Sequence, residues 1–298
     1  MKRFLFTVSV ILIFIYSMGE VVVRTFNFNP QTAVSENING YYSLKKNQTG
    51  VYRKGGLPVN FESNFRINNY GYNSLIDYEF NSNNSNKIGI LGDSFIEGFQ
   101  VDVDKSIGRL LEKELESKNI VYEFGFSANN LLNNIETYEK FNLNKFQTVF
   151  LFLDLDDIHT DIPHKTPFNS YLAFKELHLR NFYDYFKFIK FLNFNHEIIR
   201  KLKSGLNFGV KSIPIKVTNN CNDSNHHKTL LNFIAKNKNV VVVLKNDIEF
   251  FKSILGEIEY IEIIHDLKPF SFGYDMHWNL NGRKNVVNSI MKWVNQKK

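Results

Sequence analysis

A serine at the end of a short apolar run is the first residue in this sequence whose position suggests chemistry. The run 87–91 stops at Gly92-Asp93-Ser94, where a helical pattern begins. In an α/β protein, ligands bind at the carboxyl ends of the strands, because the turn that follows exposes side chains and backbone N–H groups together. Ser94 is therefore a candidate nucleophile. The alternative is structural: Ser94 and Glu97 also fit Ser-x-x-Glu, a capping box in which the hydroxyl only satisfies free amides of a helix.

An aspartate and a histidine two residues apart stand near the C-terminus, directly before the last amphipathic stretch. They are Asp275 and His277. In an extended loop both can face the same side, so that the Asp275 carboxylate accepts a hydrogen bond from Nδ1–H of His277. Nε2 is then left to take the hydroxyl proton of Ser94, which makes an otherwise weak alcohol nucleophilic. The spacing therefore predicts a Ser-His-Asp triad.

The elements that must position these residues follow from a regular alternation of apolar runs and amphipathic stretches after residue 86. This alternation is typical of a mainly parallel sheet with helices on both faces. We expect strands at 87–91, 120–124, 148–153, 239–244 and 260–264, and helices near 106–117, 129–141, 247–255 and 281–295. In a flavodoxin-like strand order, the turn after the first strand and the loop before the last helix can meet at the carboxyl edge.

The Gly-Asp-Ser block that ends at Ser94 and the Asp-x-His block that ends at His277 together resemble the SGNH (GDSL) hydrolase family, and the resemblance spans 87–298. It implies a three-layer α/β/α sandwich with a mainly parallel, flavodoxin-like five-stranded sheet. It also implies an enzyme that acts on ester bonds, since the family contains esterases, lipases and deacetylases. Ser94, Asp275 and His277 are then the catalytic triad.

Two further patterns bear on this resemblance. The segment 66–72 looks like a stretch that precedes the core in membrane-anchored bacterial members of the family. An α/β-hydrolase is disfavoured, because its nucleophile needs Gly-x-Ser-x-Gly, whereas Ile96 stands where Ser94 would need the second glycine.

The oxyanion hole is where the sequence departs from the family pattern. The resemblance implies three donors: the N–H of Ser94, a glycine N–H whose place Ala128 takes, and an asparagine side chain whose place Asp156 takes. A backbone N–H survives an alanine that does not need positive φ. An ionised carboxylate only accepts hydrogen bonds, and the lost donor is worth about 3 kcal/mol. Either Asp156 is protonated, or Asn129 or Asn130 supplies the donor, or the chemistry is weak.

A dense set of acidic and imidazole groups follows the third expected strand. One interpretation is a metal site of hard oxygen and nitrogen ligands. The other is a strand end that turns into solvent, where acidic residues cap and solvate. We favour the second and expect no metal and no cofactor. The set comprises Asp154, Asp156, Asp157, His159, Asp161 and His164.

Composition and the N-terminus bound the class of protein. The net charge of +6 comes from 36 basic and 30 acidic residues scattered along the 298-residue chain, which argues against nucleic acid as a partner. A single cysteine permits no intrachain disulfide. Lys2 and Arg3 followed by the apolar run 4–18 resemble an export signal. Without an evident cleavage site, we expect 1–25 to be an uncleaved signal anchor, with the remainder on the extracytoplasmic side.

Two regions fall outside the expected core pattern. Residues 26–86 are rich in Asn, Ser, Gly and Tyr and predict an irregular extension with short strands at 51–53 and 65–67. Residues 158–238 predict a helical insertion that contains an aromatic helix within 182–194. That helix is either a lid or membrane-surface helix, or an amphipathic helix packed on the sheet, which we favour.

The sequence thus predicts a membrane-anchored serine esterase that acts on an acylated envelope carbohydrate or lipid. An O-acyltransferase with the same triad is one alternative, because a sugar hydroxyl can replace water. A non-catalytic protein that binds a glycan or a partner is another alternative, which we consider because the carboxylate of Asp156 stands where an oxyanion donor is expected. The residues do not predict an oligomeric state.

Overall fold

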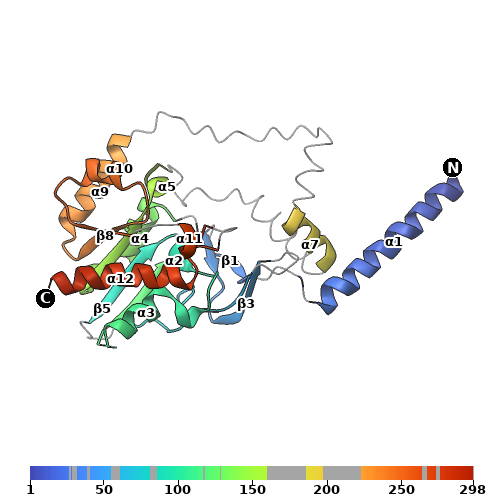
Figure 1. Ribbon diagram of the computed structural model, residues 1–298, viewed down its shortest axis with the longest axis horizontal. Coiled ribbons are helices and arrows are strands. Elements are labelled where there is room, and N and C mark those ends of the chain that lie inside the picture. Colours follow the sequence, from blue (N-terminus) through green and yellow to red (C-terminus); the bar gives the residue numbers. More distant parts are fainter. Residues whose placement is uncertain are drawn as a thin grey trace. The chain divides into compact units, whose positions relative to one another are not determined.

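The computed structural model describes most of the chain (Figure 1). The described residues are 1–26, 28, 32–38, 41–54, 61–80, 86–116, 118–127, 129–159, 186–196, 223–263, 267–272 and 276–297. They belong to two compact units. The described parts of 1–32, 51–62 and 167–217 form one unit, and those of 33–50, 63–166 and 218–298 form the other.

The second unit is built on a five-stranded parallel sheet. Its strands are short and almost wholly buried, as expected for strands covered on both faces. The order β6-β5-β7-β8-β9 is the flavodoxin-like order 2-1-3-4-5, so the predicted sheet is confirmed. The strands are β5 (Lys87–Gly92), β6 (Ile120–Gly125), β7 (Thr148–Leu153), β8 (Val240–Leu244) and β9 (Tyr260–Glu262).

Helices cover both faces of this sheet and complete a three-layer α/β/α sandwich (Figure 1). On one face, α3 (Ile107–Glu114) and α12 (Leu280–Gln296) bury apolar side chains against Ile90 and Phe150. The other face is covered by α4 (Leu131–Lys140), α9 (Asp223–Lys236) and α10 (Ile248–Leu255). Of these helices α9 was not predicted, because it lies inside 158–238 and its first half is polar.

Two pairs of strands and several short helices lie outside the five-stranded sheet. In the second unit, β1 and β2 form an antiparallel pair. The predicted strands at 51–53 and 65–67 fall within β3 and β4, which pair with each other. The bounds are β1 (Ser35–Ile38), β2 (Tyr41–Leu44), β3 (Gln48–Lys54), β4 (Phe61–Ile67), α2 (Ser94–Glu97), η1 (Val103–Lys105), η2 (Leu143–Lys145), α5 (Leu155–His159) and α11 (Leu267–Phe270).

A tyrosine from the segment before the core covers the edge strand β6. The Tyr78 hydroxyl accepts from the Glu123 N–H at 2.8 Å and donates to the Glu123 carbonyl at 2.6 Å. Its ring stacks on Tyr122 with centroids 4.3 Å apart. Backbone groups of a sheet edge need such partners. This segment therefore belongs to the packed core of the second unit.

The first unit contains a long apolar helix, α1 (Lys2–Thr25). An 18-residue stretch of it has a mean hydropathy of 2.1, and the helix is long and apolar enough to cross a membrane, a property that signal sequences share. The helix α7 (Lys187–His196) lies against it, because the Glu20 carboxylate accepts from the N–H groups of Lys187 and Phe188 at 3.1 and 2.8 Å. The aromatic stretch was expected to pack on the sheet, whereas its described ring contacts are with Tyr16 of α1 and with Phe28, which follows α1. Residues 182–185 of that stretch lie outside the described part.

Candidate active site

Ser94 is the first residue of the short helix α2, directly after strand β5 ends. The N-cap of this helix is Asp93, whose Oδ1 accepts from the Phe95 N–H at 3.0 Å. The capping-box interpretation of Ser94 is therefore wrong. Asp93 performs the capping, and the hydroxyl of Ser94 has a different partner.

That partner is His277, whose Nε2 lies 2.8 Å from Ser94 Oγ. The two residues are 183 positions apart in the sequence, and the parallel sheet brings them together at its carboxyl edge. A hydroxyl within hydrogen-bonding distance of an imidazole nitrogen is the arrangement in which the imidazole acts as a general base.

The loop that carries His277 is fixed by its neighbours. Asn279 caps α12 by accepting from the Gly282 N–H at 3.0 Å, and its amide donates to the Pro269 and Ser271 carbonyls at 2.8 Å. Trp278 is 2% exposed, and its ring lies 4.8 Å from that of Phe95. Its burial makes it a wedge that packs the loop rather than a platform for a sugar.

Two of the predicted site residues lie outside the described part of the chain. They are Asp275, the expected acid of the triad, and Ala128, the expected second oxyanion donor. Their roles stay predictions from the sequence.

The third expected oxyanion position, Asp156, lies exposed in the first turn of α5. Of the two alternative donors, Asn129 is buried, and its amide donates to the Gly92 carbonyl at 3.3 Å and to Asn134 Oδ1 at 3.5 Å. Asn130 accepts from the Asn133 N–H at 3.0 Å and caps α4. The Asn129 amide would have to leave these two acceptors to serve as an oxyanion donor, whereas Asn130 caps α4 through its side-chain oxygen.

A buried lysine next to Ser94 was missed in the sequence. Lys245 follows β8, and its Nζ lies 2.8 Å from Asp93 Oδ2, 2.9 Å from Asp154 Oδ2 and 3.3 Å from Asp157 Oδ2. These three carboxylates are close enough to hold a metal ion, but the ammonium group lies among them. The signal that could have revealed it is a lysine directly after the run 240–244, at the same sheet edge as Ser94.

The acidic residues Asp154 and Asp157 after β7 form hydrogen bonds and ion pairs within the protein. Asp154 Oδ1 accepts from the Asp157 N–H at 3.1 Å, and Asp157 Oδ2 accepts from the Asp154 N–H at 2.7 Å, which starts α5. Asp157 is 5% exposed. Burial raises its pKa above the ordinary value, and Asp93 and Asp154 raise it further against the opposing charge of Lys245. The expected capping by acidic residues is present, but the expectation that the strand end turns into solvent is wrong for Asp157. The side chain of His159, and all of Asp161 and His164, lie outside the described part.

Glu97 ends α2 and joins it to the loop after β6. Its buried carboxylate accepts a short hydrogen bond from the Ser127 hydroxyl, and its carbonyl accepts from the Asn73 amide at 2.8 Å. Burial raises the pKa of Glu97 to about 7. Gly125 packs so closely that an added Cβ would overlap the backbone of Ile96 and Glu97. The helix of the nucleophile is therefore held against β6.

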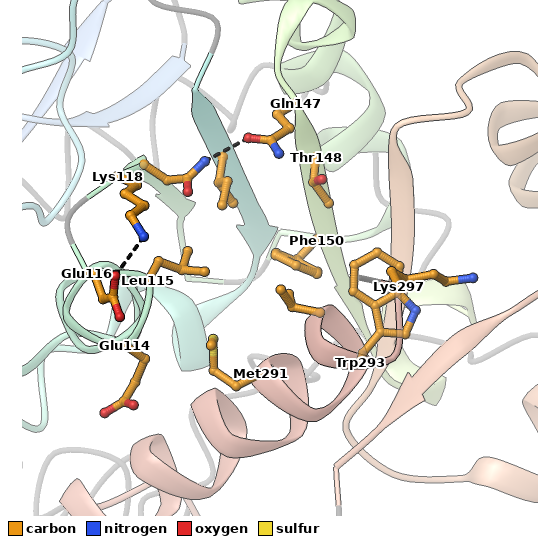
Figure 2. A pocket seen from close by; sticks show the side chains of 13 residues that line it. Glu114, Leu115, Glu116, Lys118, Gln147, Thr148, Phe150, Met291, Trp293 and Lys297 are labelled. Atoms are coloured by element: carbon orange, nitrogen blue, oxygen red, sulfur yellow. Dashed lines mark hydrogen bonds and ion pairs between the residues drawn. The ribbon is translucent and has the colours of Figure 1, made fainter.

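A groove lies at the amino ends of the strands, opposite to the carboxyl edge where Ser94 lies (Figure 2). It is formed by the ends of α3 and α12 together with residues from the amino ends of β5 and β7. Phe150 and Trp293 line it, and Lys297 and Lys118 lie at its margin. Since Ser94 and His277 are at the carboxyl edge, this groove takes no part in their chemistry.

The comparisons with known proteins find solved structures similar to this chain, among them the three described next. No family model and no curated protein matches the sequence. A member of the lipolytic protein G-D-S-L family from Veillonella parvula DSM 2008 is 13% identical with a TM-score of 0.37, over 69% of this chain and 96% of that one. A putative lipolytic protein of that family from Desulfitobacterium hafniense DCB-2 is 14% identical with a TM-score of 0.35, over 68% and 98%. A carbohydrate acetylesterase family member from Sinorhizobium meliloti is 10% identical with a TM-score of 0.36, over 70% and 97%. These proteins are what the chain is similar to, and the function proposed below rests on the chain's own residues.

Proposed function

We propose that this chain is a serine esterase of the SGNH type, with Ser94 as nucleophile and His277 as general base. The observation that carries the proposal is the distance of 2.8 Å between Ser94 Oγ and His277 Nε2. In the same proposal Asp275 accepts from Nδ1–H of His277 and fixes its tautomer, as the Asp-x-His spacing predicts.

The reaction proceeds in two halves. Ser94 Oγ attacks the ester carbonyl while its proton passes to His277 Nε2, and the new C–O bond gives a tetrahedral intermediate. The N–H groups of Ser94 and Ala128 receive the negative oxygen. The bond to the alcohol then breaks, and His277 gives its proton to that leaving group. Water, deprotonated by His277, releases the acid from the acyl-enzyme and restores Ser94.

The substrate class follows from the proposed location. If α1 anchors the chain in a membrane with Lys2 and Arg3 on the cytoplasmic side, the site faces the cell envelope. Esters available there are acyl groups on polysaccharides and lipids. We therefore propose an acylated envelope carbohydrate or lipid as the substrate, with water as the acceptor. A sugar hydroxyl in place of water would make the same steps an O-acyl transfer.

The test is hydrolysis of p-nitrophenyl acetate by the full-length chain in detergent. We expect the wild type to release p-nitrophenol and Ser94→Ala to release it at no more than the background rate. Ser253→Ala is the matched control, because its hydroxyl lies exposed on α10 and bonds only to its own helix. Activity that survives Ser94→Ala would refute the assignment.

One observation favours a non-catalytic binding protein as the second candidate. Asp156 stands where the resemblance implies an asparagine donor, and an ionised carboxylate there would repel the oxyanion. Under this alternative the folded wild type binds an acylated glycan without turning over any ester. Turnover of p-nitrophenyl acetate that depends on Ser94 would eliminate it.

A further inference from the structure

Lys245 is enclosed by carboxylates at the sheet edge where Ser94 lies. Its side chain is 2% exposed, and its Nζ is within 3.3 Å of Asp93, Asp154 and Asp157. Removing an ammonium group from water is costly, and a buried ion pair is often no more stabilising than apolar residues of the same volume. We therefore ask which strand ends and side chains the cluster holds in place, rather than how much it adds to the free energy of unfolding.

The three carboxylates belong to the ends of two other strands, β5 and β7. The backbone N–H of Lys245 donates to the Leu153 carbonyl at 3.0 Å, which fastens the end of β8 to the end of β7. Its side chain then reaches across to Asp93, which follows β5. One residue thus links three neighbouring strand ends in the sheet.

The two oxygens of Asp93 have separate partners. Oδ2 accepts from Lys245 Nζ at 2.8 Å, while Oδ1 accepts from the Phe95 N–H at 3.0 Å and caps α2. Ser94 lies between Asp93 and Phe95 in the chain. The Asp93 carboxylate therefore bridges the residue before the nucleophile to the backbone N–H of the residue after it. The orientation of that carboxylate depends on the ammonium group.

A second contact leads from Lys245 to His277. Nζ lies 4.9 Å from the centroid of the Phe95 ring, a cation–π distance. His277 also lies against that ring, with centroids 4.8 Å apart. Lys245 therefore contacts Asp93, which precedes Ser94 in the chain, and Phe95, whose ring lies against His277.

We propose that Lys245 is a positioning residue, which holds Ser94 and His277 at hydrogen-bonding distance through Asp93 and Phe95. This inference rests on the proposed esterase function. In Lys245→Met the volume is nearly kept, but the three carboxyl groups around Nζ, of which Asp157 is buried and the other two are partly buried, lose their counter-charge and repel one another. Asp93 then turns toward solvent and releases the Phe95 N–H. The Ser94 hydroxyl moves away from His277.

The kinetic test uses the full-length chain in detergent, with kcat and KM for p-nitrophenyl acetate and thermal unfolding recorded for each variant. We expect Lys245→Met to lower kcat about 100-fold with KM changed less than about threefold, because a displacement of about 1 Å at reacting groups costs this much. Lys252→Met is the matched control, since this lysine lies half exposed on α10. It should keep the wild-type kcat.

Asp93→Asn tests the same contact and is the variant to use if Lys245→Met does not fold. Asparagine retains the cap but loses the charge that faces Lys245, so we expect kcat to fall about tenfold. The double variant should lose no more than the worse single variant, because both changes break one interaction. A folded Lys245→Met, or in its place a folded Asp93→Asn, with kcat within threefold of wild type overturns the proposal.

A spectroscopic readout keeps this proposal separate from the proposed esterase function. The ¹³Cε1–¹H resonance of His277, assigned by its loss in His277→Gln, reports the ring current of Phe95. We expect this resonance to shift in Lys245→Met, or in Asp93→Asn if that variant is used, but not in Lys252→Met. An unchanged resonance overturns the positioning role even if the wild type hydrolyses no ester. Absence of wild-type turnover together with the expected shift would refute the esterase alone.

Discussion

The buried carboxyl of Glu97 gives a prediction whose magnitude can be worked from the structure. This residue is 6% exposed, and its side chain meets the Ser127 hydroxyl between α2 and the loop after β6. Burial raises its pKa from 4.5 to about 7. The folded protein therefore holds a proton here at pH values at which the unfolded chain has released it.

The sign of the effect follows from this difference. Between pH 4.5 and about 7 the folded state binds more protons than the unfolded state at Glu97, so the contribution of this group to stability falls as the pH rises. Below this window the acid is neutral in both states. Above it the full cost of burying the carboxylate is present, roughly 3 kcal/mol at about 1.4 kcal/mol per pH unit.

The perturbation is Glu97→Gln, which keeps the shape and an acceptor for Ser127 but cannot ionise. We expect the variant to match the wild type at pH 4 and to exceed its free energy of unfolding by up to about 3 kcal/mol at pH 8. Thermal unfolding followed by circular dichroism at both pH values measures this. Taking the difference between variant and wild type at each pH cancels the titration of all other groups.

The control is Glu139→Gln, since Glu139 lies exposed on α4. Its difference from wild type should be the same at pH 4 and pH 8. If the advantage of Glu97→Gln also stays the same at the two pH values, the burial of a neutral acid between α2 and β6 is wrong.

Three further substitutions test the packing and the oxyanion hole. Tyr78→Phe removes the hydroxyl that bonds to the backbone N–H and carbonyl of Glu123 on the edge strand. Urea unfolding should show that the free energy of unfolding falls by about 1–3 kcal/mol. An unchanged free energy of unfolding would contradict the burial of these backbone groups beneath Tyr78. Gly125→Ala forces α2 away from β6, so kcat should fall more than about tenfold, and an unchanged kcat would show that the helix tolerates the shift. Asp156→Asn supplies the missing donor and should raise kcat about tenfold or more, whereas no gain would place residue 156 outside the oxyanion hole.

The sheet could be predicted from the sequence because its strands are nearly continuous apolar runs separated by amphipathic stretches. The run before Gly92 and the run 148–153 are buried on both faces, and the structure has them as β5 and β7. Short continuous apolar runs between amphipathic stretches predict such strands without knowledge of their neighbours. The helix α9 escaped prediction because its polar first half carries no such signal.

The candidate site was predictable where chemistry depends on a short motif and not where it depends on contacts between strands. Ser94 and His277 lie in recognisable blocks, and their side chains are in contact. Lys245 belongs to no motif, and its role depends on the parallel register that brings the ends of β5, β7 and β8 together. The alternative interpretation of Ser94 as the cap of α2 was wrong because Ser-x-x-Glu fits one residue later than the true cap, Asp93.

The central claim is that Ser94 is a nucleophile activated by His277. Incubation of the full-length chain with a fluorophosphonate, followed by peptide mass spectrometry, tests it most directly. Phosphonylation of a serine requires the hydroxyl to attack while a base removes its proton. We predict an adduct on Ser94 in the wild type and its loss in His277→Gln. An unlabelled Ser94 in the folded wild type, or labelling that persists without His277, would contradict the claim.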